Sequence, residues 1–383
     1  MFRNFSASYA GHVVDDNLGF QGTPANDRRY SNERLAQAFG WALDFSQHLE
    51  ALGFDEFWMA EHHFQPEGYE CIPNLLMLSL YLAGNTERLR FGCGFNIAPM
   101  WHPLRLAEDF AMADILTNGR VIFGVGRGYH SREVETFDAP MLDGDANREL
   151  FEEQLEIIIK AFSTESFSHN GKHYRLPADV PYRGYQLEEL SLVPRPLRQP
   201  VEIWQPLVSG TPRGIDFMAK KGIKALVANT PEPTRRERVH MYQEASKKYG
   251  RNLELGEDIA FGYRFFIGET KEKAIEEARP YFEEAMKFAA PLGLMQLRPE
   301  QIEAVSNPGA ARGVELPTLE AAVANNVWLC GPAESIVEHL KGVEQEYPGV
   351  ERVNLGSVMG MPQAVFKDQL TKFAEGVLPA FNT

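Results

Sequence analysis

The stretch WMAEHHF, residues 58–64, places one glutamate and two histidines side by side at the end of an apolar run. Glu61, His62 and His63 could act as metal ligands, as acid–base groups or as packing side chains. Successive side chains of a strand point to opposite faces, so the two histidines cannot both ligate one ion from a regular strand. The chain also lacks the H-x-H and H-E-x-x-H patterns of zinc hydrolases. We therefore expect no metal site.

Other hydrolytic chemistries find little support in the sequence. Glu61 is the only obvious carboxylate at the expected active end, whereas a glycosidase needs two carboxylates that face each other. No G-x-S-x-G motif is present, and Cys93 falls in the middle of an expected buried strand. These absences leave acid–base chemistry and cofactor binding as the roles to examine.

The elements that must position these residues alternate regularly along the chain. Short β-branched or aromatic runs are followed by longer amphipathic segments, a pattern that predicts a parallel sheet. About eight such units favour a closed (β/α)8 barrel, and no G-x-G-x-x-G at the first βα turn supports an open dinucleotide-binding sheet. The expected strands cover residues 2–8, 54–61, 88–99, 120–130, 201–212, 223–230, 258–270 and 350–360.

Two segments interrupt this alternation, residues 163–200 and 291–325. Both are rich in proline or glycine, and long loops in a compact fold are usually lids or binding loops. We expect one barrel domain over residues 1–383, with insertions after strand 4 and before strand 8.

Composition restricts the partners and the compartment. The 383 residues carry a formal net charge of −15, which disfavours nucleic acid and anionic membranes as partners. No run of about 18 apolar residues predicts a membrane span, and the start of the chain lacks a signal-peptide pattern. Three cysteines, Cys71, Cys93 and Cys330, predict no disulfide framework. A cytoplasmic location is therefore expected.

Phosphate recognition has a physical basis at the ends of two expected strands. RGYHSRE places Arg127 and Gly128 directly after the fourth strand, and VSGTPRG places small and hydroxyl residues before the next helix. Helix N-terminal N–H groups bind anions, and an arginine adds a charge-assisted contact. The alternative is a surface ion pair at Arg127 and a simple helix cap in the second loop. If phosphate binding holds, a phosphorylated cofactor lies between the two loops.

Three motifs carry a resemblance to a known family. EHHF (61–64), NIAPMWHPLRLAEDFAMADILTNGR (96–120) and FGVGRGYHSREVETF (123–137) resemble the bacterial luciferase-like flavin monooxygenases, and FAEGVLPAF (373–381) is similar to their C-terminal helix. The resemblance implies a (β/α)8 barrel that takes reduced FMN from a separate flavin reductase. It further implies reaction with O2 to a flavin C4a-peroxide that oxidises a second substrate, and a homodimer. A related branch of the family uses a deazaflavin for hydride transfer.

The resemblance also implies roles for individual residues. His62 corresponds to an acid–base histidine near the isoalloxazine, and Asn96 lies where strand three approaches the ring. Gly126 stands where the luciferase subunit carries a cysteine, so thiol chemistry at this position and the light-emitting reaction are not implied. The residues implied to bind FMN are Asn96, Arg127, Gly128, Tyr129, Ser209, Gly210 and Thr211.

The substrate side is expected around the barrel opening, because a peroxyflavin requires a pocket that excludes water. We expect Phe64, Tyr69, Met100 and Trp101 to line it, together with parts of the two long loops. Glu61 is expected to orient a histidine or to form a salt bridge, and His63 to support His62 or to pack.

The function expected from these residues is a two-component flavin-dependent monooxygenase. Its partners would be a small or medium-sized organic substrate, O2 and a flavin reductase. The alternatives are a flavin- or deazaflavin-dependent oxidoreductase without oxygenation, and a non-catalytic flavin-binding barrel. The sequence leaves open the substrate and the choice among hydroxylation, Baeyer–Villiger insertion and C–S or C–N cleavage.

Overall fold

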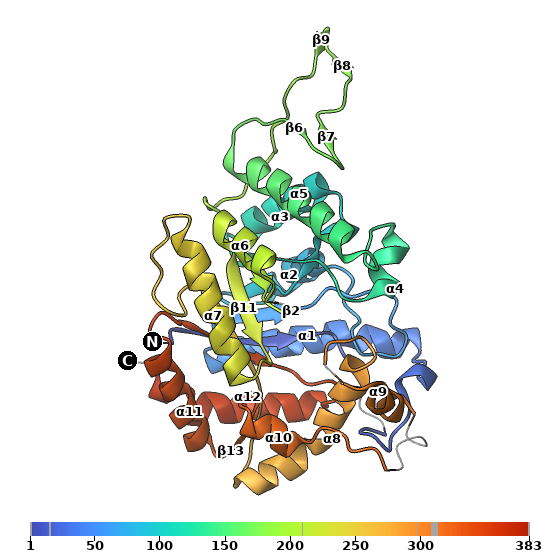
Figure 1. The fold of residues 1–383 in the computed structure, drawn as a ribbon, viewed down its shortest axis with the longest axis vertical. Coiled ribbons are helices and arrows are strands. Elements are labelled where there is room, and N and C mark those ends of the chain that lie inside the picture. Colours follow the sequence, from blue (N-terminus) through green and yellow to red (C-terminus); the bar gives the residue numbers. More distant parts are fainter. Residues whose placement is uncertain (1, 15–16, 209, 296, 308–312, 382–383) are drawn as a thin grey trace.

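The computed structural model describes residues 2–14, 17–208, 210–295, 297–307 and 313–381. Its centre is a closed barrel of eight parallel strands, which confirms the predicted (β/α)8 fold. Figure 1 shows the helices arranged around the strands. Each strand pairs with the next around the circle, and β14 closes it by pairing with both β12 and β1. In order around the barrel the strands are β1 (Asn4–Tyr9), β2 (Glu56–Met59), β3 (Arg90–Cys93), β5 (Val121–Gly126), β10 (Ile203–Pro206), β11 (Lys224–Ala228), β12 (Ile259–Ile267) and β14 (Arg352–Gly356).

The inside of the barrel changes in character from one end to the other. We call the N-terminal ends of the strands the floor and their C-terminal ends the mouth. The floor is made of charged side chains, namely Glu56, Arg90, Glu202, Lys224 and Arg352. An apolar layer above it is made of Trp58, Ile122, Trp204 and Ala260, with Phe95 and Leu226 packed against them. The floor and this apolar layer close the barrel from below.

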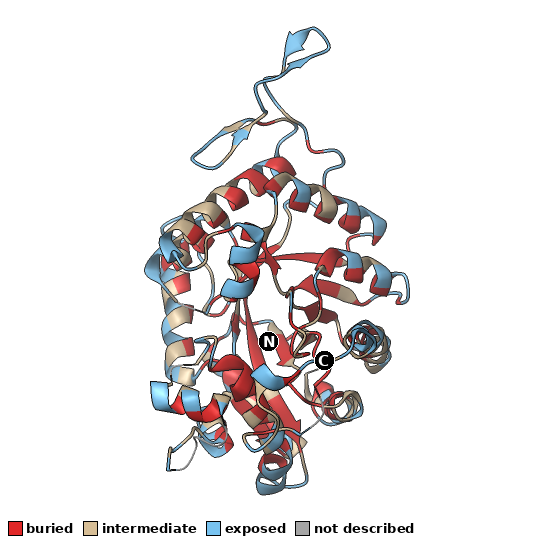
Figure 2. Cartoon of the chain, turned by 90° about the vertical axis from the view of Figure 1, so that its right-hand side faces the viewer, coloured by how far each residue is buried: buried red, intermediate tan, exposed pale blue. Residues whose placement is uncertain are grey.

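The helices surround the barrel with their apolar faces turned inward, as the burial colours of Figure 2 show. Local signals set their ends: Ser31 caps the first helix by accepting a hydrogen bond from the Arg34 N–H at 3.3 Å, and Gly53 ends it with φ of 89°. The surrounding helices are α1 (Asn32–Leu52), α2 (Leu75–Ala83), α3 (Pro103–Leu116), α5 (Gly144–Ser163), α6 (Pro212–Lys221), α7 (Glu232–Lys247), α11 (Ala333–Glu346) and α12 (Gln363–Gly376). None of the helices in the described ranges combines the length and hydropathy needed to cross a membrane.

The chain between β12 and α11 departs from the barrel pattern. It holds α8 (Lys271–Ala289), α9 (Pro299–Ser306), α10 (Leu319–Ala324) and β13 (Trp328–Gly331). The sequence predicts the helix α8 but does not predict the strand β13. Strand β13 pairs with the C-terminal half of β12, beyond the barrel. Helix α11 packs on the outer face of β12, where the rings of His339 and Tyr263 lie 5.5 Å apart. Because α11 occupies the outer face of β12, α8 lies at another position.

Helix α8 crosses the mouth of the barrel. Glu284 of α8 accepts hydrogen bonds from Arg28 at 2.5 Å, from the Tyr69 hydroxyl at 2.6 Å and from the Gly19 N–H at 3.1 Å. Lys287 donates to the Gly19 carbonyl at 2.9 Å. These partners belong to the loops that follow β1 and β2, so the buried ion pairs attach α8 to the mouth of the barrel.

The segment after α5 forms two small hairpins. They consist of β6 (His169–Asn170) with β7 (Arg175–Leu176), and β8 (Pro181–Tyr182) with β9 (Tyr185–Gln186). Figure 1 shows them projecting beyond α5 and α3. The first hairpin is anchored by Glu153 of α5, which accepts from the Tyr174 N–H at 2.9 Å. Tyr174 packs edge-on against His102 at the rim, with ring centroids 5.4 Å apart.

Candidate functional site

His62 lies in the loop directly after β2, and its side chain is 4% exposed. Its N–H donates to the Ile72 carbonyl at 2.9 Å, which fixes the backbone against the returning part of the same loop. Nδ1 lies 3.1 Å from Glu133, while Nε2 lies 2.9 Å from the Tyr129 hydroxyl and 3.1 Å from Glu70. Both ring nitrogens thus face carboxylates, and a doubly protonated imidazolium fits these acceptors best.

The surrounding side chains form one connected network, buried except for the half-buried Tyr129, which we call the histidine–glutamate cluster. Gln65 donates to Glu70 at 3.0 Å and to Glu133 at 2.9 Å, so it bridges the two carboxylates. His130 Nε2 lies 3.0 Å from the second oxygen of Glu70. The members of the cluster are His62, Gln65, Glu70, Tyr129, His130 and Glu133.

The cluster controls protonation at His62. Burial lowers the pKa of His62, but the charge of Glu70 and the hydrogen bond and charge of Glu133 outweigh it, so the pKa is raised. Burial raises the pKa of Glu133, and His62 overcomes this to leave it lowered. Burial and Glu70 hold the pKa of Tyr129 well above its ordinary value. The cluster therefore holds a proton on His62 at neutral pH, beside a neutral phenol.

The same cluster is where potential metal ligands converge within the described ranges. The ligand atoms of His62, Glu70 and His130 all lie within 4.8 Å of one another. Each of these atoms already takes part in a hydrogen bond to another member of the cluster. Polar atoms that hydrogen-bond to one another in this way are satisfied without an ion.

Glu61 serves the neighbouring loop and His63. One carboxylate oxygen accepts from the Ile97 N–H at 2.8 Å, and the other from Trp101 Nε1 at 2.8 Å. The second oxygen also lies 3.2 Å from Nε2 of His63. Glu61 thus orients His63, and it ties the loop after β2 to the short strand β4 (Asn96–Ile97).

The residues expected at the substrate side fall into different places. Phe64 is 51% exposed and stacks on Phe137 at the rim, and Met100 packs against Val134 and Ala139 with Ile97. Trp101 is turned toward Glu61. Tyr69 is buried and directed at the Arg28–Glu284 pair under α8. These four do not share one wall.

Arginines gather where the phosphate of a cofactor was expected. Arg127 lies directly after β5 and donates to Asn147 at 2.8 Å, and Gly128 follows with φ of 84°. Arg148 of α5 donates to the Thr211 hydroxyl at 3.2 Å, and Arg213 lies at the start of α6. Arg238 of α7 donates to the Leu207 carbonyl at 3.2 Å. The arginine cluster consists of Arg127, Arg148, Arg213 and Arg238.

Positive charge exceeds negative charge in the arginine cluster. Glu152 pairs with Arg213 at 2.8 Å and approaches Arg148 at 4.0 Å. Arg127 and Arg238 have no carboxylate partner in the described ranges. Burial lowers the pKa of Arg127, and the charges of Arg148 and Arg213 lower it further. This excess fits a phosphate dianion.

The second loop and the strand-three site also suit FMN. Thr211 caps α6 by accepting from the Gly214 N–H at 3.3 Å, and Gly210 has φ of 60° beside the Arg238 side chain. Ser209 lies outside the described residues. Asn96 is fully buried and donates to the Gly124 carbonyl at 2.9 Å, while its Oδ1 has no hydrogen-bond partner in the part of the chain that the structure describes. An acceptor left open in this way is available to an N–H of a flavin ring.

Several members of the site were not predicted from sequence. His130 and Glu133 stand within the motif RGYHSREV, so their nearness to Arg127 was a usable signal. Glu70, Arg148 and Arg238 carry no local signal, since they come from a loop and two helices that only the fold brings to the mouth.

Comparisons with known proteins identify the family. A family model described as luciferase-like monooxygenase matches residues 20–349. The chain belongs to the luciferase-like monooxygenase family. The predicted enzyme class, flavin-dependent monooxygenase, and the predicted cofactor, FMN, are therefore confirmed.

Individual relatives cover the chain to different extents. The oxygenase component of flavin-dependent trigonelline monooxygenase from Acinetobacter baylyi is 26% identical over 367 residues, and the match covers 93% of each chain. The alkanal monooxygenase beta chain from Photorhabdus luminescens is 26% identical, with 64% of this chain and 70% of the relative covered. A shorter match to an uncharacterized protein of Sinorhizobium fredii is 33% identical over 33% of this chain and 35% of that protein.

Solved structures share the barrel of this luciferase-like family member at low identity. The FMN-bound oxygenating constituent of 3,6-diketocamphane monooxygenase from Pseudomonas putida superposes with a TM-score of 0.72 at 17% identity, covering 99% of both chains. The long-chain alkane monooxygenase LadA gives 0.70 at 18% identity, covering 99% of this chain and 91% of LadA. Identities this low establish the fold and leave the substrate open.

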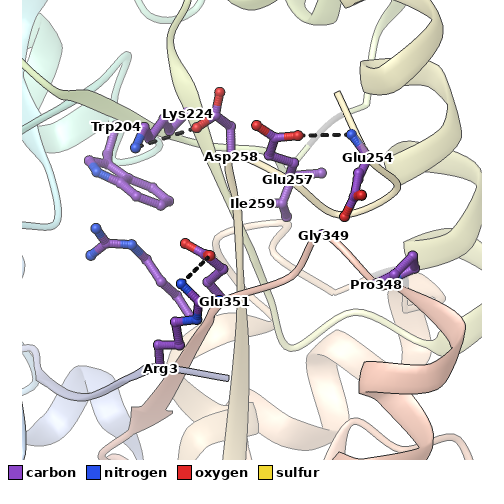
Figure 3. A pocket seen from close by; sticks show the side chains of 11 residues that line it. Arg3, Trp204, Lys224, Glu254, Glu257, Asp258, Ile259, Pro348, Gly349 and Glu351 are labelled. Atoms are coloured by element: carbon purple, nitrogen blue, oxygen red, sulfur yellow. Dashed lines mark hydrogen bonds and ion pairs between the residues drawn. The ribbon is translucent and has the colours of Figure 1, made fainter. Parts of the chain in front are cut away.

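A pocket of about 460 Å³ opens at the floor, the end opposite the two clusters (Figure 3). It is lined by charged residues such as Arg3, Lys224 and Glu351, and the Arg3–Glu351 pair is drawn in Figure 3. Active sites of such barrels lie at the mouth, where the strands end and the loops carry the functional side chains. This pocket contains none of the expected site residues, so its size does not make it the active site.

Proposed function

We propose that this family member is the oxygenase component of a two-component monooxygenase. It would take reduced FMN from a separate flavin reductase and use O2 to oxidise a small or medium-sized organic molecule. The observation that carries the proposal is the pairing at one barrel end of an arginine cluster, which suits a phosphate, with a buried imidazolium at His62. Oxygenase components and alkanal monooxygenases among the relatives support it.

Different residues of the mouth would bind FMN and supply the proton. Arg127, Arg148 and Arg238 would hold the FMN phosphate together with Thr211, and Asn96 would receive the ring. Reduced FMN would supply the electrons that activate O2. His62 keeps its proton between Glu70 and Glu133 and would release it to the reacting oxygen, a role in which a positioned histidine contributes about 10²–10⁴-fold. Burial of the histidine–glutamate cluster limits competing proton exchange with water.

Anaerobic titration followed by exposure to air tests this function. We expect reduced FMN to bind and, after mixing with O2, to give mass-shifted products from some members of a broad organic panel. A deazaflavin that binds in place of FMN and transfers hydride without O2 would replace the proposal by the oxidoreductase alternative. Binding of FMN with no product from any panel member would favour a non-catalytic flavin-binding barrel.

The oligomeric state is a further part of the proposal. Helices α2 and α3 pack against each other, and they expose Met77 (70%), Tyr81 (52%) and Leu116 (65%). Exposed apolar side chains on two packed helices of a chain with net charge −15 suit a second copy of the same chain. We expect Leu116→Glu to convert a homodimer into a monomer in light scattering, whereas Leu142→Glu, at an 83% exposed site after β5, should not. A cytoplasmic location remains a prediction.

A further inference from the structure

Arg264 stands on β12 and points into the mouth of the barrel. Its neighbours on the strand face outward: the ring of Tyr263 contacts His339 of α11, and the ring of Phe265 contacts Phe373 of α12. Because side chains alternate along a strand, Arg264 faces the opposite side, like Ala260 in the apolar layer below. It lies four residues beyond Ala260 on the same strand, in register with Gly356 of β14 and Trp328 of β13.

Arg264 has small neighbours in the barrel and, among the described residues, no counter-charge. Gly356 pairs with Ser8, and Gly262 precedes Arg264 on the same face of β12. The guanidinium carbon lies 5.9 Å from the centroid of the Trp328 ring. Within the ranges that the structure describes, Arg264 has neither a hydrogen-bond acceptor nor a carboxylate partner. A half-buried guanidinium without an acceptor is unusual, since such groups are normally paired.

The acidic groups of the mouth are already engaged elsewhere. Glu61 holds Ile97 and Trp101, and Glu70 and Glu133 hold His62. The ionisable group that acts on Arg264 is Tyr129, whose own pKa is raised, so it is a neutral phenol at pH 7. Burial lowers the pKa of Arg264 to about 10, which leaves it charged. The cation therefore lies uncompensated beside the histidine–glutamate cluster.

Arg264 is separate from the arginine cluster. The charges that act on Arg127 are those of Arg148, Glu152 and Arg213, which lie on α5 and α6. Arg264 comes from β12, on the far side of β11, and is coupled to Tyr129. The mouth thus has two positive regions: several arginines around the expected phosphate position, and one arginine coupled to Tyr129 of the histidine–glutamate cluster.

We propose that Arg264 binds a carboxylate of the organic substrate, so that the enzyme acts on small organic acids. This inference rests on the proposed function for the reaction that follows binding. A guanidinium offers two parallel N–H donors to a carboxylate, which selects the anion and fixes its orientation. Tyr129 is hydrogen-bonded to His62 and interacts electrostatically with Arg264. An acid bound to Arg264 would therefore have its reacting carbon at the same end of the barrel as His62.

Binding measurements test the proposal without turnover. The probes are benzoate and octanoate, each compared with its uncharged amide, and binding is measured by calorimetry with oxidised FMN present. We expect at least one acid to bind at least tenfold more tightly than its amide. Arg264→Gln should remove this preference, and Arg264→Lys, which keeps the charge but loses the fork geometry, should retain part of it. Equal affinities for both acids and their amides in the native protein would overturn the proposal.

Two controls separate a substrate role from other roles. FMN affinity should change less than twofold in Arg264→Gln and fall at least tenfold in Arg127→Gln. A loss in Arg264→Gln as large as that in Arg127→Gln would assign Arg264 to the flavin and overturn the proposal. The melting temperature of Arg264→Gln should equal or exceed that of the native protein, because an unpaired buried charge is removed. A clear fall would indicate a structural arginine instead.

Measurements of turnover distinguish this inference from the proposed function. With reduced FMN and O2, oxygenated products should come from acids and not from the matched amides. Products formed equally from both would overturn the role of Arg264 while supporting the monooxygenase function. Acid-selective binding with no oxygenated product would support Arg264 and count against the proposed function.

Discussion

The two ends of the barrel treat buried charge in opposite ways. At the floor, Glu56 pairs with Arg90 and Arg352, and Glu202 pairs with Lys224 at 3.0 Å and with Arg352 at 3.1 Å. At the mouth, Arg127, Arg238 and Arg264 lack carboxylate partners among the described residues. Buried ions that pair with each other close the barrel, whereas cations left without partners are available to ligands. The comparison separates residues that serve stability from those that serve function.

The histidine–glutamate cluster combines both behaviours. It lies at the mouth, yet its charges are paired as thoroughly as those of the floor. What differs is the chemistry of the pairs: an imidazolium can release its proton near neutral pH, whereas the guanidinium and ammonium groups of the floor cannot. Three substitutions and one series of pH measurements test this contrast between the two ends.

The largest effect is expected at His62. Replacement by alanine removes the proton donor, and turnover with reduced FMN should fall by about 10²–10⁴-fold. FMN affinity should stay within a few-fold, because the arginine cluster holds the phosphate. His240→Ala, at an exposed position of α7, provides the matched control and should leave turnover unchanged. Full activity in His62→Ala would remove the acid–base role.

A floor substitution should affect stability and leave ligand binding intact. Glu56→Gln removes the carboxylate that pairs Arg90 with Arg352, and breaking a buried pair typically costs about 3–5 kcal/mol. Urea unfolding measures the loss, and FMN titration of the folded variant should match that of the native protein. Lys372→Met breaks an exposed pair with Asp368 and should cost less than about 1 kcal/mol. A floor variant with normal stability would contradict the assignment of these pairs to folding.

The converse change at the mouth should affect binding and spare stability. Arg127→Gln removes a charge that faces no carboxylate, so we expect FMN to bind about 10–100-fold more weakly, which corresponds to about 1.5–3 kcal/mol for a charged hydrogen bond. The free energy of unfolding should stay the same or rise. Arg236→Gln, on the exposed face of α7, is the control. Undiminished FMN affinity in Arg127→Gln would remove this residue from the phosphate site.

The smallest effect concerns pH, where the two ends should respond in opposite directions. Burial opposes ionisation of Glu202, but Arg352, Lys224 and Arg90 lower its pKa to about 2, so its stabilisation is present above the unfolded pKa and is lost as pH falls toward 2. The raised pKa of His62 gives stabilisation that is complete below its unfolded pKa and is lost as pH rises through the folded value.

Unfolding by urea across pH measures both trends. Glu202→Gln should flatten the acid side of the stability profile, and His62→Gln should flatten the side above neutral pH. If His62→Gln left the profile above neutral pH as steep as before, the raised pKa of His62 would be wrong. A steep acid side in Glu202→Gln would show that other carboxylates dominate acid unfolding.

The barrel, the family and several residues of the site could be predicted from the sequence alone. Alternating strands and helices gave the eight strands, because a strand buried on both faces and an amphipathic helix differ in their hydrophobic period. The motifs EHHF and GVGRGYH marked His62 and Arg127, since functional groups of such barrels follow the strands directly. The helix caps at Ser31 and Thr211 were equally local and therefore readable.

Tertiary structure alone decided which charges have partners. His62 meets Glu133 across 71 positions and Glu284 meets Arg28 across 256, and no local pattern encodes such pairs. The same holds for Arg264: strand alternation turns it inward, but only closure of the barrel shows that no carboxylate of the described residues reaches it. Amphipathic periodicity made α8 look like one more barrel helix, because a helix has the same period whether it packs on the barrel or across its mouth. Residue types and local spacing thus determine the elements and the available chemistry, whereas the closed barrel determines where charge is neutralised and where it is left for a ligand.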